Sequence, residues 1–72
     1  MGEISENVIR AYALENAIKY GGKANQGAVL SGLFAEGLKK SEVKDIIPSI
    51  QKILKEVNSF SLNEQKKRFE LL

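Results

Sequence analysis

A stripe of apolar residues with helical spacing runs through positions 42–57 of this chain. At 100° per residue it spans about 120° of a helix surface. Pro48 lies on the opposite face and leaves the phase of the stripe unchanged. We therefore expect an amphipathic helix over 42–57 that is kinked at Pro48, or a turn that ends near Ile47 with Pro48 opening the following helix. The stripe consists of Val43, Ile46, Ile47, Ile50, Ile53, Leu54 and Val57.

The segment 6–20 is apolar on nearly all sides. Ser5 can cap its first turn, and Gly21 can adopt the left-handed conformation that ends a helix. A helix that is apolar around most of its circumference is buried by neighbours on several sides. We expect the helix 6–20 to form the centre of the fold.

A further helix is expected over 26–36, with Asn25 as its N-cap and Gly37 as its stop. Gly27 and Gly32 lie inside it. Each interior glycine costs about 1 kcal/mol relative to alanine, so a glycine here indicates a close approach. Packing against another element is the favoured reason, and contact with a ligand is the alternative.

The last helix is expected over 62–71. Ser61 and Glu64 have the spacing of a capping box, in which each side chain accepts from the other residue's backbone N–H. We expect the anchoring side of this helix to consist of Leu62, Phe69 and Leu72. Because β-alternation is absent, the chain is predicted to be all-α, a small bundle of four or five short helices forming one domain over residues 1–72.

The composition excludes most catalytic and metal sites. The 72 residues include no cysteine and no histidine, so Cys/His zinc sites, thiol nucleophiles and imidazole bases are absent. The carboxylates are scattered among lysines, as on solvated helix surfaces. No apolar run has the 18 or so residues that a membrane helix needs. We expect a soluble cytoplasmic module with no catalytic residue, no metal site and no membrane contact.

The glycine-rich turn at residues 21–25, Gly-Gly-Lys-Ala-Asn, is the candidate binding site, and we call it the corner. Glycines allow close backbone approach, and the first N–H groups of a helix attract phosphate oxygens. Lys19 and Lys23 supply positive charge, while Asn25, Gln26 and Gly27 are expected to expose donors at the start of the helix 26–36. Lys39 and Lys40, which follow that helix, are further candidates for contact with nucleic acid.

Two alternative sites fit the corner less well. A nucleotide-binding P-loop needs serine or threonine after its lysine, whereas Ala24 follows Lys23. A helix-turn-helix DNA reader needs guanine-reading and phosphate-binding side chains on its recognition helix, but residues 26–36 present Gln26, Ser31 and Glu36 and include no lysine or arginine. DNA is therefore the less favoured partner. The formal net charge of +2, with eight basic and five acidic residues in 37–72, is compatible with a polyanionic partner.

Three segments carry a resemblance to a known family. They are Asn16–Asn25 followed by Gly27-Ala28-Val29, then Ile46-Ile47-Pro48, and then Val57–Gln65. Together they resemble the helical region that precedes the catalytic core in archaeal-type glutamyl-tRNA synthetases. The corner is also similar to a Gly-Lys-Ala-Asp turn in the helical tail domains of tRNA-dependent amidotransferases. Gln26 departs from the synthetase pattern, in which proline is usual, so the start of the helix there is less firmly defined.

The resemblance implies a class I glutamate–tRNA ligase as the parent protein. Such an enzyme activates glutamate with ATP and Mg²⁺ and transfers it to tRNA, and its nucleotide-binding fold would lie beyond Leu72. This chain is then an N-terminal piece, inactive alone, that assists placement of a glutamate-specific tRNA. One alternative is a module that docks on the synthetase core or on another protein of the translation machinery. A helix-turn-helix DNA-binding protein is the third.

Overall fold

The computed structural model describes residues 4–72. Its elements are α1 (Glu6–Lys19), α2 (Gln26–Ala35), a single-turn 3₁₀ helix η1 (Lys40–Glu42), α3 (Val43–Asn58) and α4 (Leu62–Glu70). The residues described contain no strand, so the expected all-α bundle is confirmed. The bounds of the four α-helices differ by at most one residue from the ranges expected from the sequence.

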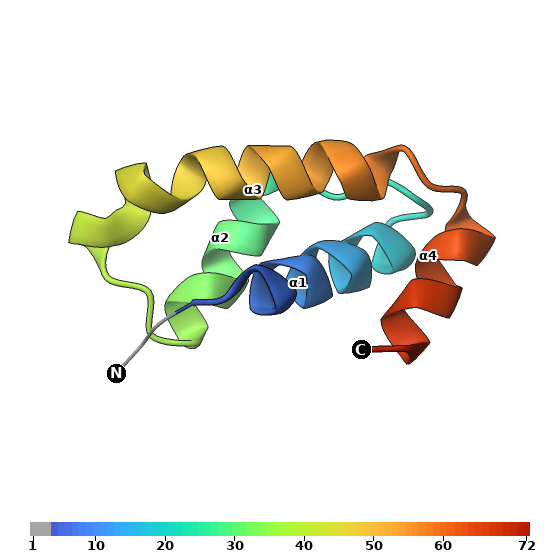
Figure 1. Ribbon diagram of the computed structural model, residues 1–72, viewed down its shortest axis with the longest axis horizontal. Helices are drawn as coiled ribbons and strands as arrows, with labels where there is room; N and C mark the ends of the chain where they lie inside the picture. The colour runs from blue at the N-terminus through green and yellow to red at the C-terminus, as the bar shows by residue number, and fades with distance from the viewer. Residues whose placement is uncertain (1–3) are drawn as a thin grey trace.

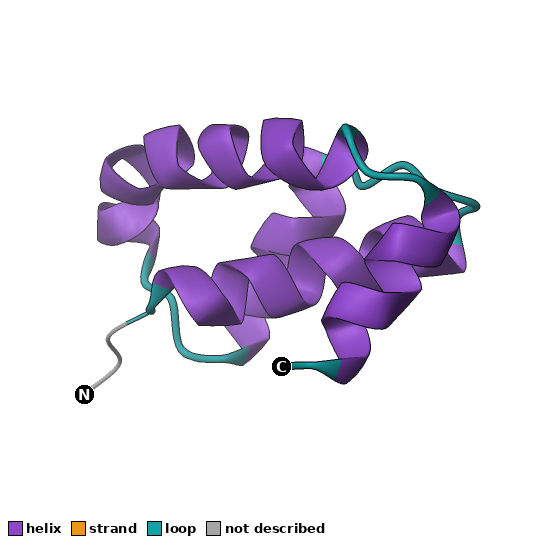
Figure 2. Ribbon diagram, turned by 45° about the vertical axis from the view of Figure 1, so that its right-hand side comes forward, coloured by secondary structure: helices purple, strands orange, loops and turns teal. Residues whose placement is uncertain are grey.

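The helices form an elongated bundle of 35 × 18 × 16 Å with α1 at its centre. α1 contacts α2, α3 and α4, as expected for a helix that is apolar on most sides. α3 runs alongside α1, α2 crosses behind the pair, and α4 packs against one end of α1 (Figures 1 and 2). The corner lies at that same end, where α3 ends and α4 begins.

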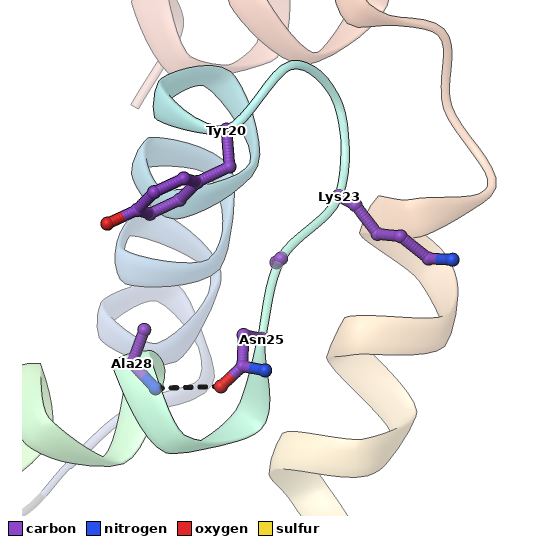
Figure 3. Close-up of a pocket in the computed structure, with 5 residues that line it drawn as sticks. Tyr20, Lys23, Asn25 and Ala28 are labelled. Atoms are coloured by element: carbon purple, nitrogen blue, oxygen red, sulfur yellow. Dashed lines mark hydrogen bonds between the residues drawn. The ribbon is translucent and has the colours of Figure 1, made fainter.

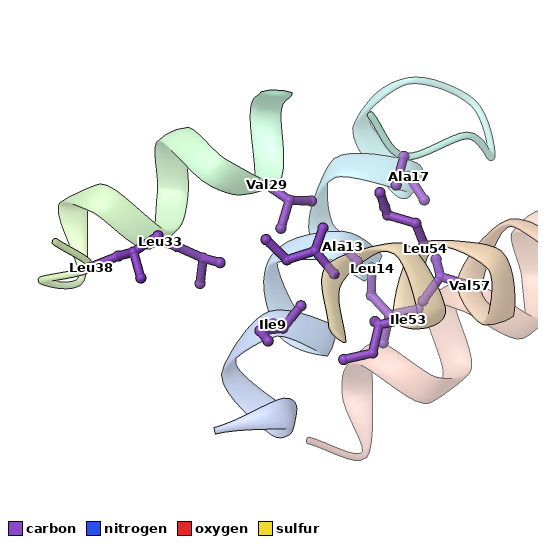
Figure 4. Close-up of a cluster of buried hydrophobic side chains, with 12 residues drawn as sticks. Ile9, Ala13, Leu14, Ala17, Val29, Leu33, Leu38, Ile53, Leu54 and Val57 are labelled. Carbon is purple, nitrogen blue, oxygen red and sulfur yellow. The ribbon is translucent and has the colours of Figure 1, made fainter. Parts of the chain in front are cut away.

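The core lies between α1, α2 and α3 (Figure 4). Its fully buried apolar side chains are Ile9, Ala13, Leu14, Ala17, Val29, Leu33, Ile50, Ile53 and Val57. The apolar stripe of α3 supplies the face that packs on α1, since Leu54 is also buried and Val43, Ile46 and Ile47 are partly buried against the core. The periodicity of residues 42–57 therefore identified the core face of α3.

α3 continues through Pro48 without a break. The alternative expectation, a turn ending near Ile47 and a new helix opening at Pro48, is wrong. Pro48 lies on the exposed side of α3 near its start. Its missing N–H leaves the carbonyl of Lys44, also exposed, to be hydrated by water, so the helix tolerates the proline here.

Gly32 allows α2 to approach α1 closely. A Cβ atom at Gly32 would lie 2.5 Å from Cδ1 of the Tyr12 ring. This distance is well inside van der Waals contact, so only glycine fits against the ring as it stands. Packing, the favoured reason for an interior glycine in α2, is confirmed at this position.

α4 is held by a polar side chain. Gln65 is fully buried, whereas Phe69 is 39% exposed and Leu72 is 57% exposed, so the expectation that these two anchor the helix is wrong. Leu62 is half-buried, as expected of an anchoring residue. α4 has few apolar side chains, and its buried residue, Gln65, donates to the backbone carbonyl of Val57 in α3.

The caps at the helix ends follow the sequence in all but one detail. Ser61 Oγ accepts from the Glu64 backbone N–H at 3.2 Å. The Glu64 carboxylate accepts from Arg68 Nε at 2.8 Å, and no bond from the Ser61 N–H to it occurs within residues 4–72. The capping box is therefore half formed, because the Glu64 carboxylate binds the charged guanidinium of Arg68, one helical turn later, instead of the Ser61 N–H.

Candidate nucleic-acid interface

The corner reverses the chain between α1 and α2. Gly21 has φ of 79° and Gly22 has φ of 121°, both in the region that favours glycine. The Gly22 N–H donates to the Ala17 carbonyl at 2.7 Å and so closes the last turn of α1. The two glycines thus turn the chain away from α1 within two residues.

The side chain of Asn58, at the end of α3, binds the middle of the corner. Its Oδ1 accepts from the Ala24 N–H at 2.7 Å, and its Nδ2 donates to the Ala24 carbonyl at 3.3 Å. One carboxamide therefore satisfies both polar backbone groups of Ala24, a residue that is only 8% exposed. The segments joined are 34 positions apart in the chain.

Two further carboxamides hold the corner on either side of Ala24. Asn16 Oδ1, from α1, accepts from the Asn25 N–H at 2.7 Å. Gln65 Nε2, from α4, donates to the Gly22 carbonyl at 2.9 Å and also to the carbonyls of Val57 and Phe60. We call Asn16, Asn58 and Gln65 the carboxamide clamp. Three helices thereby fix the backbone of the corner.

Two of the three expected backbone donors, the N–H groups of Asn25 and Gly27, are used inside the protein. Asn25 Oδ1 accepts from Gly27 N–H at 2.8 Å and from Ala28 N–H at 3.3 Å, the latter drawn in Figure 3. Asn25 is thus the N-cap of α2, as expected. The expectation that Asn25 and Gly27 present their backbone N–H groups to a ligand is wrong, because the clamp and the cap already bind them.

The side chains at the corner remain available to a partner. Lys19, Lys23 and Asn25 are exposed, and Gln26 is half-buried. Lys19 and Lys23 take part in none of the salt bridges formed within residues 4–72. Their ammonium groups are therefore free to pair with an anionic partner.

Tyr20 is the site residue that the sequence did not single out. Its side chain is 64% exposed, and Lys19 Nζ lies 5.6 Å from the centre of its ring. In the sequence it is one of many apolar residues in a helix that is apolar on nearly all sides. Its place as the last residue before Gly21, where α1 has ended, was the signal that it would leave the core.

A shallow pocket of about 540 Å³ lies beside the corner, lined by Tyr20, Lys23, Ala24, Asn25 and Ala28. In Figure 3 the side chains of Tyr20 and Lys23 leave the corner on opposite sides. The two side chains therefore do not converge on one small ligand. This arrangement suits a large partner that can contact both sides of the corner.

Lys39 and Lys40 do not join this site. They lie at η1, at the opposite end of the long axis from the corner (Figure 1). Both are exposed, and the backbone N–H of Lys39 donates to Glu42 Oε1 at 2.9 Å. The structure thus separates the candidate residues into two places, with Lys19, Lys23, Asn25 and Gln26 together at the corner.

Residues 4–72 contain no cluster of acidic side chains that could hold a metal ion. In the same residues, no helix combines the length and the apolar character needed to cross a bilayer.

No family model matches the chain, and no solved structure matches it significantly. It is similar to glutamate–tRNA ligases from Pyrococcus abyssi (47% identical over 62 residues), Methanocaldococcus jannaschii (46% over 68) and Sulfolobus acidocaldarius (39% over 71). These alignments cover 85%, 93% and 97% of this chain, but the chain spans only 11 or 12% of the length of these relatives.

Proposed function

We propose that this bundle, which is related to a segment of glutamate–tRNA ligases, is a non-catalytic domain that helps a synthetase to bind and place its tRNA. The parent enzyme would join glutamate to tRNA in the cytoplasm, using ATP and Mg²⁺ held by other parts of the protein. The lack of cysteine and histidine and the scattered carboxylates support a role without catalytic residues.

The observation that carries the proposal is that Lys19 and Lys23, which form no salt bridge within residues 4–72, lie at a rigid corner beside the exposed ring of Tyr20. Folded RNA is recognised largely through phosphates and through bases that stack on aromatic side chains. Lys19 and Lys23 supply the charge, and Tyr20 supplies a ring that is 64% exposed. A rigid corner offers these groups without first having to be ordered.

The remaining candidates have lesser parts in the proposal. The Asn25 amide group and the Gln26 side chain lie beside Lys23 and can bind sugar or phosphate oxygens. Lys39 and Lys40 can touch the same RNA only if it runs along the 35 Å axis of the bundle. We therefore assign the first contact to the corner and treat the η1 lysines as a separate region.

The salt dependence of tRNA binding tests the proposal. A filter-binding titration of a glutamate tRNA transcript should give an affinity that falls as salt rises, because bound phosphates release counterions. Replacing Lys23 with alanine should weaken binding and reduce the magnitude of the salt slope by about 0.7–0.9, the value for one lost phosphate contact. Lys44→Ala removes an exposed lysine at the start of α3 and is the matched control.

Binding that does not respond to salt, or that Lys23→Ala and Lys44→Ala weaken equally, would remove the corner as the RNA contact. Duplex DNA of the same length serves as competitor. If it displaces tRNA at equal concentration, then a general DNA-binding function is favoured over tRNA placement.

Exposed apolar side chains in and just after α4 favour protein docking as a second candidate function. Phe69 is 39% exposed, Leu71 is 78% exposed and Leu72 is 57% exposed. Phe69 also lines a hollow between α1, α2 and α4 that Glu15 and Glu36 flank. Burial, together with the Glu36 and Glu15 carboxylates, raises the pKa of Tyr12 there. The two negative charges at the hollow would repel RNA phosphates, so this face is unsuited to RNA. We propose the body of the synthetase as its occupant.

Docking is separable from RNA binding. Binding through apolar area should persist at salt concentrations that abolish the RNA complex, and should show a negative heat-capacity change. Calorimetry with the remainder of a related synthetase as titrant gives both quantities. If no heat of binding is measured at all of the salt concentrations tested, then the docking surface is unsupported.

A further inference from the structure

The carboxamide clamp fixes the residues on both sides of Lys23. The Gly22 carbonyl accepts from Gln65, while the Ala24 N–H and carbonyl bind Asn58. The main chain of Lys23 is therefore held at both ends, although its own side chain is exposed. All three clamp side chains are uncharged, and each comes from a different helix.

The hydrogen bond to Gly22 explains the glutamine at position 65 better than packing in the core does. Gln65 is fully buried, and its Nε2 donates to three backbone carbonyls, whereas its Oε1 is buried without a hydrogen-bond partner. An unpaired buried acceptor is unfavourable. A purely apolar side chain would avoid that penalty but would not bind Gly22. Gln65 thus links the position of α4 against the bundle to the backbone conformation of the corner.

We propose that Asn16, Asn58 and Gln65 are positioning residues that hold the corner in its RNA-binding shape, a proposal that rests on the function proposed above. Two consecutive glycines would otherwise leave the corner free to sample many conformations. RNA would then have to order the loop before Lys23 could reach a phosphate. The clamp removes that requirement in the free protein.

Positioning and contact have different signatures. A residue that touches a phosphate with its charge contributes to the salt slope, as expected for Lys23. The clamp residues carry no charge and bind backbone groups of the corner, so losing one should lower the affinity at every salt concentration without changing the slope. A merely structural residue would change the stability and leave the affinity of the folded protein unaltered.

Asn58→Ala is the main variant, because Asn58 is exposed and the core does not depend on its volume. Asn63→Ala, at an exposed position of α4, is the matched control. Amide hydrogen exchange should show faster exchange at Ala24 and Asn25 in Asn58→Ala, while the core amides of α1 and α3 stay protected. Affinity for a glutamate tRNA transcript should fall about tenfold, equivalent to ordering roughly one residue on binding.

Gln65→Met keeps the length of the buried side chain but cannot bind Gly22, and circular dichroism reports whether it folds. If it folds, then its affinity should fall with an unchanged salt slope, as for Asn58→Ala. Faster exchange at Ala24 in Asn58→Ala with unaltered affinity would overturn the positioning role. A reduced slope in Asn58→Ala would also overturn it, since Asn58 would then affect the charge contacts themselves.

The two proposals fail in different ways. If Lys23→Ala weakens binding and lowers the slope while Asn58→Ala does neither, then the corner contacts RNA without needing the clamp. If Lys23→Ala does not change RNA binding, then the proposed contact between the corner and RNA is rejected, whatever the effect of Asn58→Ala.

Discussion

Asn58 at the end of α3 binds both backbone polar groups of Ala24, accepting from its N–H at 2.7 Å and donating to its carbonyl at 3.3 Å. This pair joins the end of one helix to a loop between two others. With Asn16 and Gln65 it accounts for the fixed backbone of a turn that has glycine at two of its positions.

Asn58→Ala should destabilise the fold by about 1–2 kcal/mol. Two hydrogen bonds are lost, each with a net contribution of about 0.5–1.5 kcal/mol, and water can partly replace them because Asn58 is exposed. Urea denaturation measures the change. Asn63→Ala, whose side chain forms no hydrogen bond within residues 4–72, should stay within about 0.5 kcal/mol of the parent. Equal stability of the two variants would mean that the Asn58 bonds contribute nothing.

Gly32→Ala should be destabilising, although alanine is the better helix former. The added methyl group would overlap the Tyr12 ring at 2.5 Å, and overpacking of this kind costs about 1–3 kcal/mol. That exceeds the gain of about 1 kcal/mol in helix propensity. In a Tyr12→Leu background the same change should be close to neutral or stabilising. A double-mutant cycle by thermal denaturation tests this, and additive effects would show that the ring does not limit position 32.

Two neighbours in α2 should respond very differently to truncation. Leu33 is fully buried and Phe34 is 43% exposed. Leu33→Ala leaves a cavity and should cost about 2–5 kcal/mol, enough to unfold much of a bundle this small. Phe34→Ala should change stability by less than about 1 kcal/mol. Circular dichroism at increasing temperature compares them, and a reversed order would contradict the assignment of the core face of α2.

Tyr20→Ala should weaken tRNA binding by about 1–3 kcal/mol if a base stacks on the ring, while Tyr20→Phe should retain most of the affinity. The fold should tolerate both, because the side chain is 64% exposed. Fluorescence anisotropy of a labelled tRNA transcript measures the difference. The stability of both variants is measured in parallel as a control. If Tyr20→Ala binds RNA as tightly as the parent chain, then stacking on Tyr20 is excluded.

Local signals in the sequence were enough to predict the helices. Ser5, Asn25 and Ser61 cap the helices they precede, and Gly21 and Gly37 end the helices they follow, with φ of 79° and 114°. These signals act over a few residues, so they can be read without the tertiary structure. The apolar stripe of α3 also predicted which face of that helix is buried, because its period alone identifies the face.

The clamp could not be predicted in the same way. Asn58 and Ala24 are 34 positions apart, and Gln65 and Gly22 are 43 apart, so no spacing rule connects them. Polar residues are usually exposed, which is why Phe69 was expected to anchor α4 and Gln65 was not. The resemblance segments do contain Asn16, Asn58 and Gln65, but a resemblance does not state what its residues bind.

Amide chemical-shift mapping with a glutamate tRNA transcript shows directly whether the corner contacts RNA. The largest shifts should cluster at residues 19–26, with smaller effects at α4 through Gln65. Shifts confined to η1, or to the exposed apolar end of α4 at residues 69–72, would contradict this prediction.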